Sequence, residues 1–118
     1  AMAEEIITPG ENQIRGMVTV AGNPVLSTPH SKQLDAALAE LEFMVSIDIY
    51  VNETTRHADV ILPAPSSLEK DHYDVGLYLY AVRNVANYSE PVLKRDPATT
   101  DEADILLKMA GIFQGLGA

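Results

Sequence analysis

The chain has 118 residues, of which 47% are hydrophobic and 21% are charged, and it contains no cysteine. A chain of this length can bury roughly two-thirds of the surface that it exposes when unfolded, so we expect one soluble globular domain over residues 1–118. The lack of cysteine excludes a disulfide framework, a cysteine-ligated metal centre and a thiol nucleophile. The net charge of −9 argues against nucleic acid or an anionic membrane as a partner.

The sequence also predicts a cellular compartment and indicates whether the given residues are part of a longer polypeptide. No apolar run approaches the roughly 20 residues that span a bilayer, and the N-terminus lacks the basic and apolar segments of a signal peptide. A chain without cysteine is compatible with a reducing compartment, which favours the cytoplasm. Because the chain opens with Ala1-Met2, which is typical of residues left by cloning or of an internal cut, we expect the natural polypeptide to extend in both directions.

The first expected element is a strand from Gly16 to Ala21, a β-rich run that Gly22 closes. A loop follows to about Thr28, which can cap a helix that has Pro29 at its first position. The apolar residues of this helix recur at the spacing i, i+3, i+4, i+7, namely Leu34, Ala37, Leu38 and Leu41. One face of the helix is therefore expected to be buried.

Two more apolar runs follow, Phe43 to Ile47 and Val60 to Leu62, and Asn52 to His57 between them is expected to be a short helix. Nearly continuous apolar strands that alternate with helices are typical of a parallel sheet covered on both faces, with right-handed crossovers. The predicted fold class is therefore α/β, in three layers with a mostly parallel sheet.

The chain beyond Pro65 carries weaker signals. The segment from Leu77 to Val82 fits a strand better than a loop. The run Thr99-Thr100-Asp101-Glu102 resembles a capping box, and apolar residues follow it at helical spacing, namely Ile105, Leu106, Met109, Ala110 and Phe113. We expect a closing helix there, and the role of residues 70–118 is left open.

The residues that follow the first strand are candidates for ligand binding, because ligands of open α/β sheets bind outside the carboxyl ends of the strands. They are Gly22 and Asn23, then Ser27 and Thr28 at the expected helix start. Glycine lets a ligand approach the backbone closely, and the free amides of a helix start favour a phosphate. A plain turn with a capping threonine is equally compatible with this pattern.

Asp48 follows the second strand, 26 residues beyond Gly22. A dinucleotide-binding fold places an acidic residue near this spacing, where it accepts a hydrogen bond from a ribose hydroxyl. The two oxygens of a carboxylate can also accept from two adjacent N–H donors on a guanine edge. An ordinary solvated strand end is as compatible with the sequence.

Metal and acid–base chemistry have less support in the sequence. Glu53, His57 and Asp59 include types of metal ligand, but a helical turn followed by a strand would scatter them, so we expect no metal site. His30 and His72 each lie beside loop residues and are expected to be surface histidines. No serine nucleophile motif is present, so no catalytic residue is predicted.

Three segments together resemble the molybdopterin oxidoreductase family, which includes formate dehydrogenases, nitrate reductases and dimethyl sulfoxide reductases. They are Gly22-Asn23-Pro24-Val25-Leu26-Ser27, Ile47 to Thr55 with its Asp48 and Glu53-Thr54, and Ala58-Asp59-Val60-Ile61-Leu62-Pro63. Their order and spacing carry the match, which covers about Gly16 to Glu69. After Glu69 the family's common G-T-x-x-N stretch is missing, which leaves pterin contacts from residues 70–88 unsupported.

The resemblance implies a Rossmann-like third domain of a larger catalytic subunit, a molybdenum- or tungsten-bis(molybdopterin guanine dinucleotide) oxidoreductase of the formate dehydrogenase type. It also implies which residues bind the dinucleotide: Gly22 and Asn23 along its length, Ser27 at a phosphate, Asp48 and the backbone of Ile47 at the guanosine, and the backbone of Ala64 nearby. Thr54 and Thr55 are expected to support the loop instead.

In this family the metal ligand and the iron–sulfur cysteines belong to other domains. The resemblance therefore implies a cofactor-binding domain that is not catalytic alone, that has the other domains of its subunit as partners, and that is empty of cofactor when isolated. The alternative is a stand-alone α/β nucleotide-binding or receiver-like signalling module without a redox role.

Overall fold

A computed structural model describes residues 2–74 and 76–116. The chain divides into two compact units, residues 1–64 and residues 65–118, and each is described by itself. The expectation of one domain over residues 1–118 stays a prediction. No helix in the described residues is both long and apolar enough to cross a membrane.

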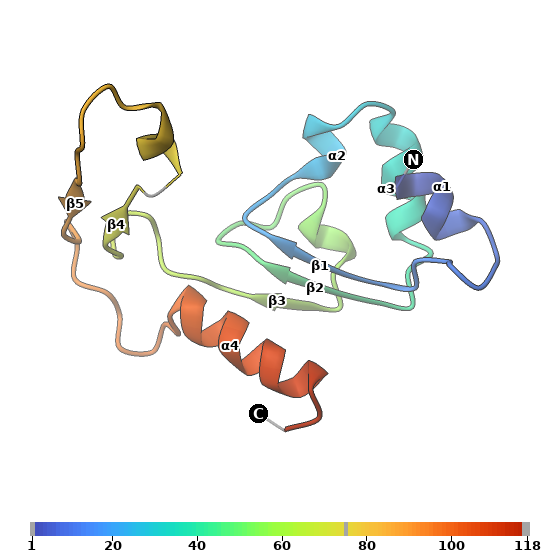
Figure 1. Cartoon of the computed structure of the whole chain (residues 1–118). Coiled ribbons are helices and arrows are strands. Elements are labelled where there is room, and N and C mark those ends of the chain that lie inside the picture. The colour runs from blue at the N-terminus through green and yellow to red at the C-terminus, as the bar shows by residue number, and fades with distance from the viewer. Residues whose placement is uncertain (1, 75, 117–118) are drawn as a thin grey trace. The chain divides into compact units, whose positions relative to one another are not determined.

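A parallel three-stranded sheet organises the first unit. The strands are β1 (Gly16–Val20), β2 (Phe43–Ile47) and β3 (Val60–Leu62), in the order β1-β2-β3 (Figure 1). The α/β class is thereby confirmed, and β2 and β3 have the predicted bounds. The first strand ends one residue before Ala21, because Ala21 has a left-handed backbone (φ 48°) that cannot continue a strand.

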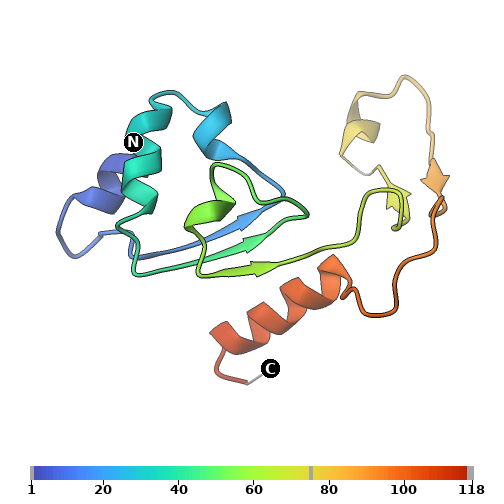
Figure 2. The same cartoon turned by 180° about the vertical axis from the view of Figure 1, so that it is seen from behind.

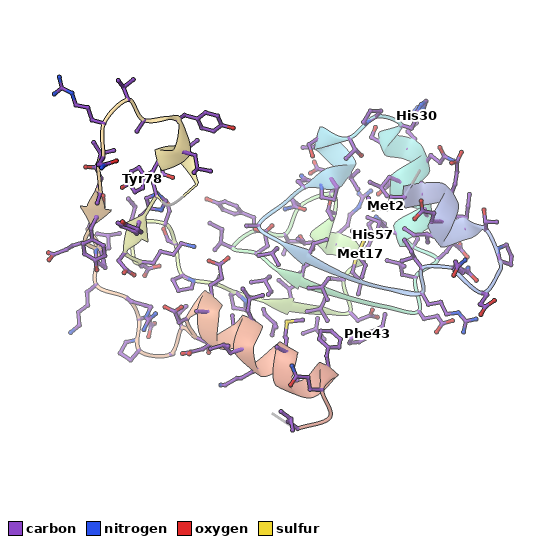
Figure 3. The ribbon with its side chains drawn as sticks, viewed as in Figure 1. Met2, Met17, His30, Phe43, His57 and Tyr78 are labelled. Carbon is purple, nitrogen blue, oxygen red and sulfur yellow. The ribbon has the colours of Figure 1, made fainter. Side chains whose placement is uncertain are left out.

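Helices cover one face of this sheet. They are α1 (Met2–Ile7), α2 (Pro24–Ser27) and α3 (Ser31–Leu38), which lie on the same side of the strands in Figures 1 and 2. Side chains alternate between the two faces of a strand, and Figure 3 shows Met17 on the helical side and Phe43 on the other. The buried core comprises Ala3, Ile6, Val25, Leu34, Ala37, Leu38 and Met44.

Two hydroxyl groups also lie on the helical face. Thr19 of β1 and Ser46 of β2 are both buried, and their side-chain oxygens are 2.7 Å apart. A buried hydroxyl without a partner would destabilise the fold, and the hydrogen bond between these two groups gives each of them a partner. The apolar face of the sheet therefore tolerates this polar pair.

The predicted helix start at Thr28 and Pro29 is wrong, although the helix itself is present. Pro24 begins a four-residue helix directly after Asn23, and Thr28 ends it by donating both its N–H and its hydroxyl to the Pro24 carbonyl. The chain then turns at His30, whose φ is 60°, and α3 begins only at Ser31. Leu41 lies beyond α3 but still packs against the core.

Two other short helices lie in this unit. The helix α1 was not expected, because six residues are too few for a readable period. The predicted helix from Asn52 to His57 is shorter, since only η1 (Thr55–His57) forms, as one turn of 3₁₀-helix. The preceding residues form a turn that the side chain of Asn52 organises, as described below.

The second unit has a two-stranded antiparallel sheet, β4 (His72–Tyr73) with β5 (Tyr88–Ser89), a 3₁₀-helix η2 (Leu77–Tyr80) and the helix α4 (Glu102–Phe113). The predicted closing helix is confirmed. Its N-cap is Asp101, whose carboxylate accepts from the Ala103 N–H at 3.0 Å.

The predicted strand from Leu77 to Val82 is wrong, because Leu77 to Tyr80 forms η2 instead. The Asp74 carboxylate accepts from the Leu77 N–H at 3.2 Å, which bends the chain at the start of this segment. The Tyr78 hydroxyl bonds both backbone polar groups of Asn87, and its ring meets that of Tyr73 edge-on at 5.6 Å. These contacts favour a turn where the residue types alone favour a strand.

Candidate functional site

The three parallel strands end at one edge of the sheet. Val20, Ile47 and Leu62 are register partners, so the segments after each strand leave the sheet at the same level. Two backbone bonds extend the pairing past the strand ends: Ala21 N–H donates to the Ile47 carbonyl at 2.9 Å, and Asp48 N–H donates to the Leu62 carbonyl at 3.3 Å. Residues that are far apart in sequence are thereby brought to one edge.

Asp48 is the first residue after β2, and its carboxylate is held by two donors of its own loop. Oδ1 accepts from the Tyr50 N–H at 3.0 Å, and Oδ2 accepts from Nδ2 of Asn52 at 3.2 Å. Each carboxylate oxygen can accept a second hydrogen bond. Because Asp48 is also partly exposed, its carboxylate is oriented by the protein and open to a ligand.

The side chain of Asn52 orients this loop. Its Oδ1 accepts from the N–H groups of Thr54 and Thr55, both at 3.0 Å, which leaves Nδ2 to donate to Asp48. The Thr55 hydroxyl in turn accepts from the Asn52 N–H at 2.8 Å and donates to the Tyr50 carbonyl at 3.0 Å. Hydrogen bonds among its own residues therefore hold the loop after β2 in one conformation.

Asn23 joins the loop after β1 to the loop after β2. Its Nδ2 donates to Oε2 of Glu53 at 2.7 Å, and its Oδ1 accepts from the Thr54 hydroxyl at 2.7 Å. The hydrogen bond from Asn23 lowers the pKa of the Glu53 carboxyl below its usual range. The Thr54 oxygen also accepts from the Val25 N–H at 3.1 Å. Side chains therefore connect the two loops that the sequence singled out.

Gly22 lies at a position where a residue with a Cβ would also fit. A Cβ at this position would lie 3.6 Å from the Val20 carbonyl and 4.0 Å from the Pro24 ring, which are ordinary contacts. Its φ is also not in the left-handed region. Among residues 2–74 and 76–116, neither packing nor backbone geometry explains the absence of a side chain here.

The other predicted residues lie along the same edge, in different environments. Ser27 is the exposed last residue of α2, and its hydroxyl donates to the Asn23 carbonyl at 3.1 Å. The side chain of Ile47 is buried, and its carbonyl already accepts from Ala21. Ala64 follows β3 by two residues and is partly buried.

The acidic and imidazole side chains that were considered for a metal site have separate partners, and one of them, Asp59, lies at the opposite end of β2. Glu53 accepts from Asn23, Nε2 of His57 lies 2.6 Å from Oδ1 of Asp35, and Asp59 accepts from the N–H of Met44 at 2.7 Å. Nowhere in residues 2–74 and 76–116 do three histidine, aspartate or glutamate residues form a group that could hold a metal ion.

Asp35 of α3 links this helix to η1, a role that the sequence analysis did not identify. Its Oδ1 accepts from the guanidinium of Arg56 at 2.5 Å and contacts His57. The hydrogen bond from Arg56, followed by that from His57, lowers the pKa of the Asp35 carboxyl. No periodicity marks such a pair, because its members are 21 residues apart in sequence.

The role of Asn52 was also missed, although the sequence carries a signal for it. Asparagine side chains often accept from backbone N–H groups two residues on, and Asn52 precedes the small polar residues Thr54 and Thr55. This pattern could have predicted the turn that replaces the first half of the expected helix.

Comparison with known proteins identifies related sequences. The family described as molybdopterin oxidoreductase matches residues 2–92. The chain is 41% identical over 61 residues to the assimilatory nitrate reductase catalytic subunit of Bacillus subtilis, and 39% identical over 67 residues to the F420-dependent formate dehydrogenase subunit alpha of Methanocaldococcus jannaschii. It is 32% identical over 101 residues to a nitrate reductase of Symbiobacterium thermophilum.

The aligned parts are small compared with these relatives. They cover 52%, 57% and 86% of this chain but only 9%, 10% and 13% of the respective relatives. The chain therefore corresponds to a limited part of much longer proteins.

Proposed function

Because the chain belongs to the molybdopterin oxidoreductase family, we propose that it holds the guanine dinucleotide part of a molybdopterin cofactor within a larger, formate dehydrogenase-like catalytic subunit. In this proposal it binds and orients the cofactor and is not catalytic alone. The supporting observation is that the ends of β1, β2 and β3 share one register row, so the three motif segments reach one edge of the sheet. Ligands of α/β sheets bind at such an edge.

The groups at this edge fit the guanosine end of such a ligand. Guanine offers two adjacent N–H donors, and each oxygen of the Asp48 carboxylate retains capacity to accept one. Tyr50 and Asn52 hold that carboxylate in place before a ligand arrives, which reduces the entropy lost on binding. Gly22, where a Cβ would make only ordinary contacts with the described residues, leaves room for a ligand against the backbone.

The remaining contacts belong to the same proposal. Asn23 donates the second hydrogen of its Nδ2 to the dinucleotide, since the first is bonded to Glu53. The Ser27 hydroxyl, which donates to the Asn23 carbonyl in the structure, gives up that bond and donates to a phosphate instead. The backbone of Ile47 and of Ala64 lines the same edge. The helix start once expected at Thr28 plays no part, because α3 begins three residues later.

The cofactor would supply the oxidation–reduction chemistry, because its molybdenum or tungsten exchanges the electrons when it is bound. The contribution of this chain is to bind the nucleotide end and thereby orient the rest of the cofactor. The catalytic steps then depend on other parts of the subunit, which we propose as the partners of this chain.

The test is a chemical analysis of the mature enzyme that contains this chain, purified from its native host. Mass spectrometry would measure molybdenum and tungsten, and fluorescence would measure the pterin released by acid. We expect stoichiometric molybdenum or tungsten together with pterin and guanine nucleotide. A mature enzyme without either metal or pterin would overturn the proposal and favour a nucleotide-binding module without a redox role.

A further inference from the structure

We propose that Thr54 is a positioning residue whose buried hydroxyl sets the orientation of the Asn23 side-chain amide at the ligand-binding edge. This inference rests on the proposed function, because it concerns how a residue of that site is prepared for its ligand. Thr54 thereby does more than support the loop, because its hydroxyl orients one particular ligand-binding side chain.

The direction of each hydrogen bond around Thr54 follows from the inventory of donors. A threonine hydroxyl has one hydrogen and two lone pairs. The Val25 N–H can only donate, so at 3.1 Å it uses a lone pair of the Thr54 oxygen. The hydroxyl hydrogen is then free to point to the amide oxygen of Asn23, 2.7 Å away.

The other end of the amide meets a group that can only accept. The ionised carboxylate of Glu53 lies 2.7 Å from Nδ2 of Asn23. The oxygen of the amide thus faces a donor and its nitrogen faces an acceptor. An amide turned over by 180° would place its oxygen against the Glu53 carboxylate, which is repulsive. It would also remove the Asn23 oxygen as the acceptor of the Thr54 hydroxyl hydrogen, and a buried donor that loses its acceptor is costly.

Because Thr54 is buried, it fixes the orientation of the Asn23 amide more firmly than the exposed Glu53 does. Thr54 is 0% exposed and Val25 is 6% exposed, whereas Glu53 is exposed. Water can replace the exposed Glu53 carboxylate as an acceptor, but it has no access to the position of the Thr54 hydroxyl. The buried hydroxyl therefore sets the amide, and the exposed carboxylate assists it.

The consequence for binding is a defined donor. With one Nδ2 hydrogen bonded to Glu53, the second hydrogen of Asn23 remains for an oxygen atom of the dinucleotide. Loss of the Thr54 hydroxyl frees the amide to rotate, so part of the binding free energy must then be spent on ordering it.

The neighbouring threonine provides a matched control. Thr55 is also 0% exposed, and its hydroxyl also makes two hydrogen bonds, but its partners are the Asn52 N–H and the Tyr50 carbonyl. Thr54→Val and Thr55→Val each remove one buried hydroxyl and keep the side-chain shape. Only the first removes a contact to Asn23.

The experiment follows the Asn23 side-chain amide in the 118-residue chain by ¹⁵N–¹H NMR and measures the dissociation constant of GDP by calorimetry. We expect Thr54→Val to shift the Asn23 Nδ2 signals towards those of a free amide and to raise the constant about tenfold, which corresponds to one hydrogen bond. Thr54→Ser, which keeps the hydroxyl, should restore both values. Thr55→Val should leave the Asn23 signals in place.

Several results would overturn the inference. They are unchanged Asn23 signals in Thr54→Val, the same shift in Thr55→Val, or failure of Thr54→Ser to restore the signals. If Thr54→Val does not fold, the inference is tested by NMR of the wild-type protein. Its Thr54 hydroxyl proton should exchange slowly with solvent and show a nuclear Overhauser effect to the Asn23 side chain, and absence of both would overturn the inference. Absence of GDP binding to the wild type would count against the proposed function, whereas the amide signals test the role of Thr54 without any ligand.

Discussion

Replacement of Asp48 by asparagine tests the proposed guanosine contact most directly. The carboxylate accepts one hydrogen bond on each oxygen, from the Tyr50 N–H and from Nδ2 of Asn52. An asparagine has only one side-chain oxygen, so its NH₂ group must face one of these donors. The Asn52 amide cannot turn over to offer an acceptor, because its oxygen holds the N–H groups of Thr54 and Thr55.

The expected magnitudes follow from this geometry. Asp48→Asn loses one hydrogen bond of the loop, and because Asn52 is only partly buried, water can replace the lost acceptor. The free energy of unfolding should therefore fall by only about 0.5–1.5 kcal/mol. A guanine edge with two N–H donors would meet one acceptor instead of two, so its binding should weaken by about 1–3 kcal/mol.

The assay is calorimetric titration with GDP, together with urea unfolding of the same samples. Asp59→Asn is the matched control, since it makes the same change of charge at the opposite end of β2, where Asp59 accepts from the Met44 N–H. An asparagine oxygen can still accept that bond, so the control should bind GDP like the wild type. Equal GDP affinity of Asp48→Asn and the wild type would refute the assignment of Asp48.

Three further predictions concern binding and stability. Gly22→Ala should raise the free energy of unfolding by about 0.4–1 kcal/mol, because a Cβ fits there and the unfolded chain loses conformational freedom. Calorimetry of the same variant should show weaker GDP binding. A clear loss of stability would show that a Cβ does not fit at this position. Asp35 has a lowered pKa because Arg56 and His57 bond its carboxylate, so its stabilising effect is present above the unfolded value near 3.8 and is lost as the pH falls through the folded pKa. Urea midpoints of Asp35→Asn should therefore fall less on acidification than those of the wild type, and parallel pH profiles would argue against the link. Leu38→Ala should lower the free energy of unfolding by about 2–5 kcal/mol, because Leu38 is only 1% exposed; a value near zero would show that this helix does not pack as described.

The strands and the closing helix could be read from the sequence because their signals are local. Phe43 to Ile47 and Val60 to Leu62 are short apolar runs bounded by polar residues or proline, and both form strands with these bounds. The helix after Asp101 carries a capping residue and a helical period, and it forms from Glu102 to Phe113. Hydrophobic period and capping chemistry act over a few residues, so one segment is enough to reveal them.

The misassigned segments are those in which a side chain bonds to the backbone. Asn52 replaced the first half of an expected helix with a turn, and Pro24 with Thr28 formed a separate short helix where a loop was expected. The strand expected from Leu77 became η2, where Asp74 and Tyr78 make bonds to backbone groups. Such bonds compete with the regular backbone pattern and are not visible in hydrophobic periodicity.

The sequence by itself determined the α/β class, the three parallel strands and the family, since these depend on local apolar patterns and on motif order. It also indicated that Gly22 and Asp48 follow neighbouring strands. Only the tertiary structure decided how these positions are joined, because the register brings the strand ends level and Asn23 then reaches Glu53 and Thr54, residues 30 and 31 positions away. A side-chain hydrogen bond depends on distances of a few ångströms, and folding alone creates those distances between segments so far apart in sequence.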